Sequence, residues 1–249
     1  MSVIEHVRRP RWRRRWLFVA GGSLATVVVG KAALGRALGF RAALVWAAVA
    51  GPILAYESWF FYSRREAGAL GAIRAANAVT LARGWLFAAV GGFVALQPSA
   101  AVAWVPGLCY GTGALLDQVD GRLARHTSTE SSLGEQLDMA IDTLGFVVAP
   151  AVAVAWGHLP VWYLLLAAAR YLFKLGRGYR EWRGLPVHEL SPSSLRRNLS
   201  GVQMAFLTVA LLPLVPPDVL AVAAVGVLTP SLVMFVRDYL VLAGHSTDV

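Results

Sequence analysis

The sequence predicts an all-α membrane protein, a polytopic bundle of transmembrane helices. Three observations favour this fold class: 57% of the 249 residues are hydrophobic, 15% are charged, and the mean hydropathy is +0.58. A soluble domain has about 25% charged residues and could not keep so much apolar surface away from water. Disorder requires low hydrophobicity and a disulfide scaffold requires several cysteines, whereas this chain has one cysteine, so both classes are excluded.

Eight segments are apolar enough to be transmembrane helices, each of which needs about 20 mostly apolar residues. They lie at 16–33, 42–62, 75–96, 99–118, 132–156, 160–176, 198–215 and 217–240. Turn-forming residues separate several of them, namely Gln97-Pro98-Ser99, Gly157-His158-Leu159-Pro160 and Pro213-Leu214-Val215-Pro216-Pro217. Ser191 and Pro192 predict a helix start before the seventh segment, with serine as N-cap and proline at the first helical position.

The placement of arginine predicts the orientation in the cell membrane, because cytoplasmic loops are enriched in Arg and Lys. Six arginines lie between positions 8 and 15, which keeps the N-terminus in the cytoplasm. Eight crossings then place the C-terminus and the links at 63–74, 117–131 and 174–197 on the same side. The loops near 97, 158 and 214 hold no Arg or Lys, whereas Lys31, Arg36 and Arg41 depart from the rule. Orientation, and not nucleic-acid binding, explains the net charge of +9.

Aspartates gather at the cytoplasmic ends of the fourth and fifth segments. Asp117 and Asp120 are three residues apart, and Asp138 and Asp142 are four apart. Each pair therefore lies on one face of its helix. The link between the two helices is short, so they should be antiparallel neighbours whose aspartate pairs face each other. Carboxylates at membrane depth are costly and usually mark a site.

Four converging carboxylates need a cation, and no basic residue lies on the same faces of these two helices. Oxygen ligands suit Mg²⁺ or Mn²⁺ better than zinc, and two such ions form a clamp suited to phosphoryl transfer. The alternative is a set of exposed helix-end carboxylates without a metal. Gly121 and Gly134 leave room for a bulky group such as a nucleotide, or for a neighbouring helix. Arg125 can pair with a diphosphate or with Asp120.

Together these residues read Asp117-x-x-Asp120-Gly121-x-x-Ala124-Arg125, eight further residues, and Gly134-x-x-x-Asp138-x-x-x-Asp142. This pattern resembles the signature of the CDP-alcohol phosphotransferase (CDP-alcohol phosphatidyltransferase) family. The resemblance extends over about 71–249 and implies a core of six membrane helices. Residues 1–70, the basic N-terminus and two extra transmembrane helices, have no counterpart in the minimal family fold.

The resemblance implies a phospholipid-synthesis reaction in which an alcohol attacks a CDP-linked lipid, usually CDP-diacylglycerol, and CMP leaves. It makes Asp117, Asp120 and Asp138 ligands of two Mg²⁺ or Mn²⁺ ions. Asp142 becomes the general base and a further metal ligand. The residues implied to line the CDP site are Gly121, Ala124, Arg125 and Gly134. The resemblance also suggests a homodimer, and a site that opens both to the cytoplasm and to lipid.

Two shorter patterns are similar to other parts of the family. Asn77-x-x-Thr80-x-x-Arg83 is similar to its first core helix and adds Asn77 and Thr80 to the CDP site. Arg197-x-x-Ser200-x-x-Gln203 is similar to a later pattern, which makes acceptor-binding candidates of Arg196, Arg197, Ser200 and Gln203. Interhelical hydrogen bonds are the alternative role for Asn77, Thr80 and Gln203.

The acceptor depends on the basic residues that flank the last cytoplasmic loop. They are Arg170, Lys174, Arg177, Arg180, Arg196 and Arg197. If some of them point into the pocket, the acceptor is a phosphorylated alcohol. Otherwise they set the orientation and contact lipid headgroups, and a zwitterionic or neutral acceptor such as serine remains open.

Two other classes of protein compete with this interpretation. Intramembrane prenyltransferases also use aspartate-rich motifs, but theirs lie far apart, whereas Asp120 and Asp138 are 18 residues apart. A non-enzymatic transporter would have internal repeats and charges near the membrane midplane. This chain shows no repeat, and its aspartates gather at one interface.

Overall fold

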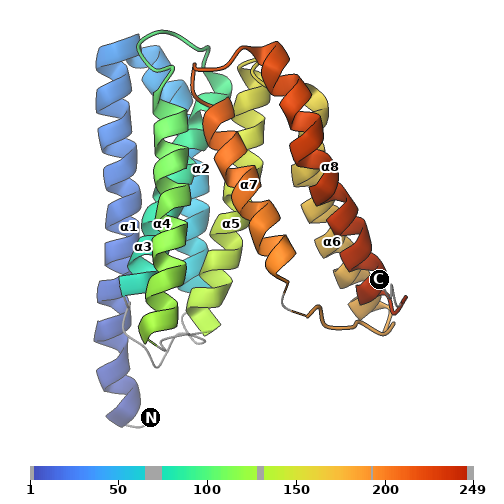
Figure 1. Ribbon diagram of the computed structural model, residues 1–249. Helices are drawn as coiled ribbons and strands as arrows, with labels where there is room; N and C mark the ends of the chain where they lie inside the picture. Colours follow the sequence, from blue (N-terminus) through green and yellow to red (C-terminus); the bar gives the residue numbers. More distant parts are fainter. Residues whose placement is uncertain (1–2, 65–74, 128–131, 192, 246–249) are drawn as a thin grey trace.

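The computed structural model describes residues 3–64, 75–127, 132–191 and 193–245, and gives side chains at 13–64, 77–118, 133–191 and 193–245. This part of the chain is a helical bundle without strands (Figure 1). Its elements are α1 (Val3–Leu38), α2 (Phe40–Ser63), α3 (Ala75–Gly91), η1 (Gly92–Ala95), α4 (Val105–Thr127), α5 (Ser132–Ala155), η2 (Val161–Leu164), α6 (Leu165–Trp182), α7 (Ser194–Ala210) and α8 (Pro217–Leu242). The predicted all-α fold class is confirmed, because each of the eight predicted segments corresponds to one of these α-helices.

Five helices of the described chain are long and apolar enough to cross a membrane. They cover Arg13–Leu38, Phe40–Ser63, Asn77–Ala95, Leu133–Ala155 and Pro217–Leu242. Helices α4 and α6 carry several charged residues, and α7 is only 17 residues long. Membrane crossing by these three helices therefore stays a prediction from their place in the bundle.

Two predicted helix starts are wrong. The fourth helix begins at Val105, because residues 99–104 form turns in which the amides of Val102 and Ala103 donate to the Ser99 carbonyl, at 3.0 and 2.9 Å. The seventh helix has Ser193 as its N-cap in place of Ser191. The Ser193 hydroxyl accepts from the Arg196 amide at 3.4 Å and so satisfies one of the free donors of the first turn.

The extra N-terminal helices share a hydrophobic core with the rest of the bundle. Trp46 of α2 is 2% exposed, and its indole nitrogen donates to the Ala89 carbonyl at 2.9 Å. A Cβ added at Gly30 or Gly92 would lie 2.2 or 2.4 Å from the Trp46 ring. Only glycine leaves room for this indole between α1 and the end of α3. Helices α1 and α2 are thus built into the fold.

Close packing around Phe87 holds α3, α4 and α5 together. Phe87 of α3 is fully buried, and a Cβ added at Gly113 of α4 or Gly145 of α5 would lie 2.5 or 2.7 Å from its ring. The two glycines let their helices approach the same aromatic ring from different sides. This packing sets the distance between the three helices that carry the charged residues described below.

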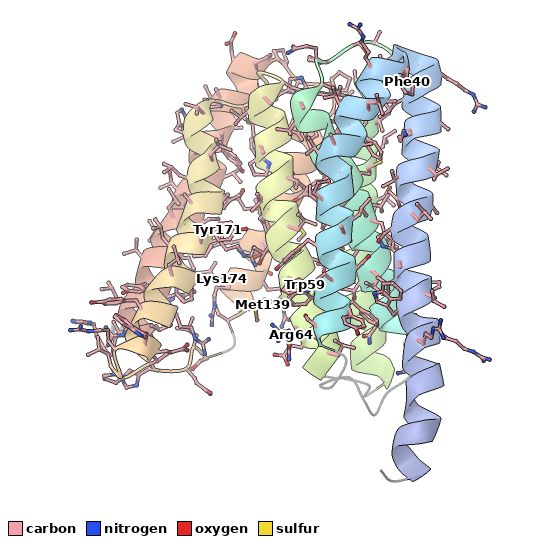
Figure 2. All side chains as sticks on the ribbon, turned by 180° about the vertical axis from the view of Figure 1, so that it is seen from behind. Phe40, Trp59, Arg64, Met139, Tyr171 and Lys174 are labelled. Carbon is pink, nitrogen blue, oxygen red and sulfur yellow. The ribbon has the colours of Figure 1, made fainter. Side chains whose placement is uncertain are left out.

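One end of the bundle carries the polar residues. Both ends of the described chain lie there, together with the end of α4 and the start of α5 (Figure 1). Figure 2 shows Arg64, Met139 and Lys174 toward this end, and Phe40 at the opposite end. Arg64 donates to the side chain of Gln136, which ties α2 to α5 here. This arrangement is the one expected if both termini and the α4–α5 link lie on the same side of the membrane.

Candidate active site

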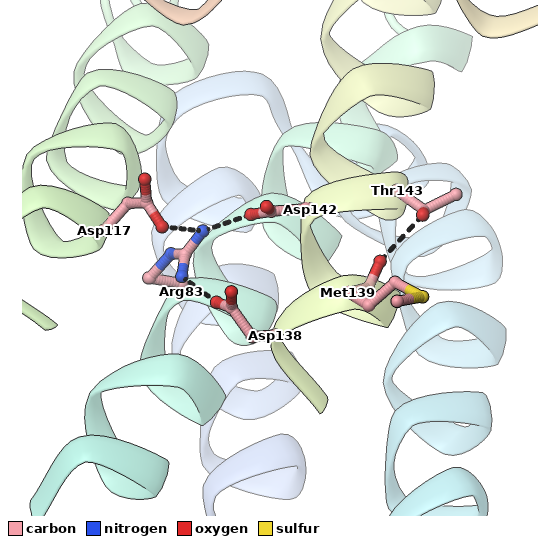
Figure 3. Close-up of polar contacts among 6 residues, drawn as sticks. All are labelled: Arg83, Asp117, Asp138, Met139, Asp142 and Thr143. Atoms are coloured by element: carbon pink, nitrogen blue, oxygen red, sulfur yellow. Dashed lines mark hydrogen bonds and ion pairs between the residues drawn. The ribbon is translucent and has the colours of Figure 1, made fainter. Parts of the chain in front are cut away.

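Three helices bring an arginine and three aspartates together (Figure 3). Arg83 of α3 reaches Asp117 of α4 with Nη2 at 2.8 Å, and Asp142 of α5 with the same nitrogen at 2.5 Å. Its Nη1 donates to Asp138 of α5 at 2.7 Å. The carboxylates of Asp117, Asp138 and Asp142 each offer an oxygen atom within 4.8 Å of the others. The predicted convergence of aspartates from the fourth and fifth helices is present.

Arg83, at the centre of the cluster, contradicts one expectation from the sequence. We expected no basic side chain to neutralise the aspartates, because none lies on their own helical faces. Arg83 comes from a third helix, and its side chain is 0% exposed, whereas those of Asp117, Asp138 and Asp142 are 33, 46 and 25% exposed. The guanidinium is therefore a fixed, buried countercharge beneath carboxylates that water can reach.

The carboxylates fit a hard divalent cation. The ion pairs of all three with Arg83 run through Oδ1. Three carboxylates and one guanidinium leave a net negative charge, and the aspartates are partly exposed. An all-oxygen ligand set of this kind suits Mg²⁺ or Mn²⁺.

The structure describes the side chains of only some of the other predicted site residues. Asp120, Gly121, Ala124 and Arg125 belong to α4, which continues to Thr127, but their side chains lie outside the described residues. Gly134 lies in the first turn of α5, one helical turn before the first aspartate of that helix.

Asn77 and Thr80 lie on α3 before Arg83. They are 7 and 3% exposed, so both polar side chains are buried inside the bundle. Their spacing places them near the arginine face of the helix. They lie at the same end of α3 as the aspartate cluster.

A cavity of about 160 Å³ lies between α5, α6, α7 and α8. Its lining residues are Phe146, Leu166, Arg170, Arg196, Leu199, Ser200, Gln203, Ser231, Met234, Phe235 and Asp238. Three of the four predicted acceptor-binding residues, Arg196, Ser200 and Gln203, are thus brought to one cavity. Arg197 is not among the lining residues, and it is exposed.

Gln203 also has the interhelical role considered as the alternative. Its Nε2 donates to the Val227 carbonyl at 3.0 Å and to the Ser231 hydroxyl at 2.9 Å, and its Oε1 accepts from the Tyr163 hydroxyl. Gln203 is 2% exposed, so a buried amide with both ends bonded fixes α7 against α8. Its amide therefore shapes the cavity wall more than it offers free hydrogen-bonding groups.

Arg170 is a further cavity residue with a direct relation to the aspartates. Its guanidinium lies over the Phe146 ring at 4.8 Å from the centroid, and it interacts electrostatically with Asp142. From the sequence we grouped Arg170 with the basic residues near the loop. Its position inside an apolar run was the available signal, because charged residues in a membrane helix usually serve a site.

The comparisons with known proteins agree with the site. A family model described as CDP-alcohol phosphatidyltransferase matches residues 73–242, more than half of the chain. A protein of Mycobacterium leprae (strain TN), named CDP-diacylglycerol–serine O-phosphatidyltransferase, is 43% identical over 58 residues, which cover 23% of this chain and only 18% of that protein. No solved structure matches. The chain belongs to the CDP-alcohol phosphatidyltransferase family, whose members are transferases of phospholipid biosynthesis.

Proposed function

We propose that the protein transfers a phosphatidyl group from a CDP-linked lipid such as CDP-diacylglycerol to an alcohol and releases CMP. The observation that carries the proposal is the convergence of Asp117, Asp138 and Asp142 at one point of the bundle. The family supplies the reaction class, in which a CDP-linked substrate and an alcohol are the two reactants. We further propose that the site faces the cytoplasm and that the protein acts as a homodimer.

The donor site would be built from α3, α4 and α5. Asp117, Asp120, Asp138 and Asp142 would hold two Mg²⁺ or Mn²⁺ ions, which supply positive charge to the diphosphate and to the leaving CMP. The residues that would line the CDP site are Gly121, Ala124, Arg125, Gly134, Asn77 and Thr80. Arg83 orients the carboxylates from beneath, since its ion pairs fix one oxygen of three of them.

Asp142 is proposed as the general base. Among the three described aspartates it is the least exposed, at 25%. Phe146, which lines the cavity, follows Asp142 by one helical turn on α5, so the two side chains share one face of that helix. A hydroxyl group held in the cavity would therefore approach Asp142, and proton removal by a positioned carboxylate accelerates such reactions by about 10²–10⁴-fold.

The acceptor is proposed to carry an anionic group. Arg170 and Arg196 both line the cavity, and guanidinium groups bind phosphate and carboxylate with two parallel hydrogen bonds. Ser200 and Gln203 would complete the acceptor site, and Arg197 would attract the acceptor at the cytoplasmic surface. A phosphorylated alcohol and serine both satisfy this requirement, and the name of the Mycobacterium leprae relative makes serine the first acceptor to test.

The test uses purified full-length protein in nanodiscs with CDP-diacylglycerol, Mn²⁺ or Mg²⁺, and a panel of alcohols. We expect CMP release that requires both an acceptor and the divalent cation, and that EDTA abolishes. Asp142→Asn should lower the rate at least about 100-fold. Asp218→Asn is the matched control, because Asp218 is an exposed residue in the first turn of α8. Undiminished CMP release by Asp142→Asn would contradict the assigned role.

A further inference from the structure

The acceptor cavity contains a carboxylate as well as two guanidinium groups. Asp238 of α8 lines the cavity opposite Arg196 of α7, with Oδ2 3.6 Å from Nη1. The Asp238 side chain is 15% exposed and that of Arg196 is 29% exposed. A distance of 3.6 Å is an ion pair without a good hydrogen bond. Arg237, the preceding residue, also interacts with Asp238 electrostatically, and among the described residues neither arginine donates a hydrogen bond to it, so its carboxylate keeps acceptor capacity.

Arg196 is held from a second direction. Its Nη2 donates to the Ser191 carbonyl, and its backbone amide donates to the N-cap Ser193 at 3.4 Å. The carbonyl fixes the position of the guanidinium without help from Asp238. Holding Arg196 in place therefore does not by itself account for a half-buried carboxylate at this point of the cavity wall.

The charges in the cavity favour a zwitterionic amino acid over a phosphorylated alcohol as the acceptor. Arg170, Arg196 and Asp238 together carry a single net positive charge. A phosphate monoester carries about −1.5 to −2 at neutral pH, and Asp238 would repel it. A zwitterionic amino acid has a carboxylate for the guanidinium groups and an ammonium group for Asp238, so each of its charges meets the opposite charge.

The size and position of the cavity agree with a small zwitterion. An apolar cavity of about 150 Å³ accommodates a benzene ring, and this cavity of about 160 Å³ admits an amino acid of similar size. The Ser200 and Ser231 side chains add hydroxyl groups to the wall. Phe146 of the wall lies one helical turn after Asp142 on α5, and Arg170 lies over its ring, so a hydroxyl on an amino acid at this wall would be on the side of the proposed base.

We propose that Asp238 determines acceptor specificity by binding the ammonium group of a zwitterionic hydroxy amino acid. This inference rests on the proposed transfer reaction and narrows its acceptor. Arg170 and Arg196 bind the carboxylate of the amino acid, and its hydroxyl group is the nucleophile. The ammonium group is only bound and does not react, so this role of Asp238 adds no chemical step to the transfer reaction.

The experiment measures CMP release from CDP-diacylglycerol with three acceptors that differ in one group. L-serine carries both charged groups, 3-hydroxypropanoate lacks the ammonium group, and ethanolamine lacks the carboxylate. We expect wild-type protein to prefer L-serine to 3-hydroxypropanoate in kcat/KM. In Asp238→Asn this preference should fall at least about tenfold through a higher KM for L-serine, because a hydrogen bond between two charged groups is lost. Asp218→Asn should retain the wild-type preference.

The outcomes separate this inference from the proposed function. Glycerol 3-phosphate is added as a phosphorylated comparison, and a wild-type protein that uses it and not L-serine overturns the role of Asp238 but leaves phosphatidyl transfer intact. Absence of CMP release with every acceptor refutes the transfer reaction itself. Equal losses with all acceptors in Asp238→Asn make Asp238 a structural residue and overturn the inference. If that variant does not fold, the test is the melting temperature of the wild-type protein. L-serine should raise it and 3-hydroxypropanoate should not, and equal shifts with both overturn the inference.

Discussion

Replacing Arg83 by glutamine removes a buried cation from three carboxylates at once. Breaking one partner of a buried ion pair costs about 3–5 kcal/mol. The lower end applies here, because Arg83 is fully buried but the three aspartates are 25–46% exposed and water screens part of their repulsion. At about 2–4 °C per kcal/mol for a chain of this size, a loss of about 3 kcal/mol lowers the melting temperature by about 6–12 °C.

The assay is thermal unfolding of full-length protein in nanodiscs, measured in EDTA and again in Mn²⁺. Mn²⁺ should raise the melting temperature of Arg83→Gln more than that of wild type, since the metal supplies the missing positive charge. Arg177→Gln is the matched control. It breaks an exposed ion pair with Glu181, at 2.8 Å and 58 and 53% exposure, which is worth at most about 1 kcal/mol. The reasoning is refuted if Arg83→Gln in EDTA melts within about 2 °C of wild type.

Two further substitutions test the packing of the bundle by the same thermal assay. Glu57→Met should raise the melting temperature, because both Glu57 carboxyl oxygens are buried and have no hydrogen-bond partner among the described side chains and backbone, at a cost of about 1–3 kcal/mol. A lower melting temperature would mean that Glu57 has a polar partner, and the exposed Glu189→Met is its control. Gly145→Ala should destabilise the protein by about 1–3 kcal/mol, since the new Cβ meets the Phe87 ring at 2.7 Å. Gly178→Ala, with nothing within 4 Å, should not, and equal effects of the two would contradict the packing argument.

The aspartate cluster could be predicted from the sequence because its geometry follows from short spacings along the chain. The spacing of Asp138 and Asp142 places both on one face of a helix, and the short link to the preceding helix brings Asp117 opposite them. Helical periodicity and a short connection are enough to predict this convergence. Asp120 belongs to the same predicted group, but its side chain lies outside the described residues.

Arg83, the cation that pairs with these aspartates, could not be predicted from the sequence in the same way. Arg83 lies 34 residues before Asp117, on a helix whose rotation is set by the contacts of Phe87 with Gly113 and Gly145. Nothing in the spacing along the chain shows which face of α3 meets α4 and α5. The mixed charge of the cavity could not be predicted for the same reason, because Arg170 and Asp238 come from different helices whose contact depends on tertiary packing.

The Arg83 cluster also bears on the order of events during biogenesis. As the chain leaves the ribosome and enters the bilayer, the guanidinium of α3 emerges before the carboxylates of α4 and α5. Each carboxylate therefore meets a positive charge of the same polypeptide as soon as its helix docks, and this one charge offsets part of the repulsion among the three. Docking of α3, α4 and α5 therefore has a countercharge that is already covalently part of the chain, whichever of the three helices inserts last.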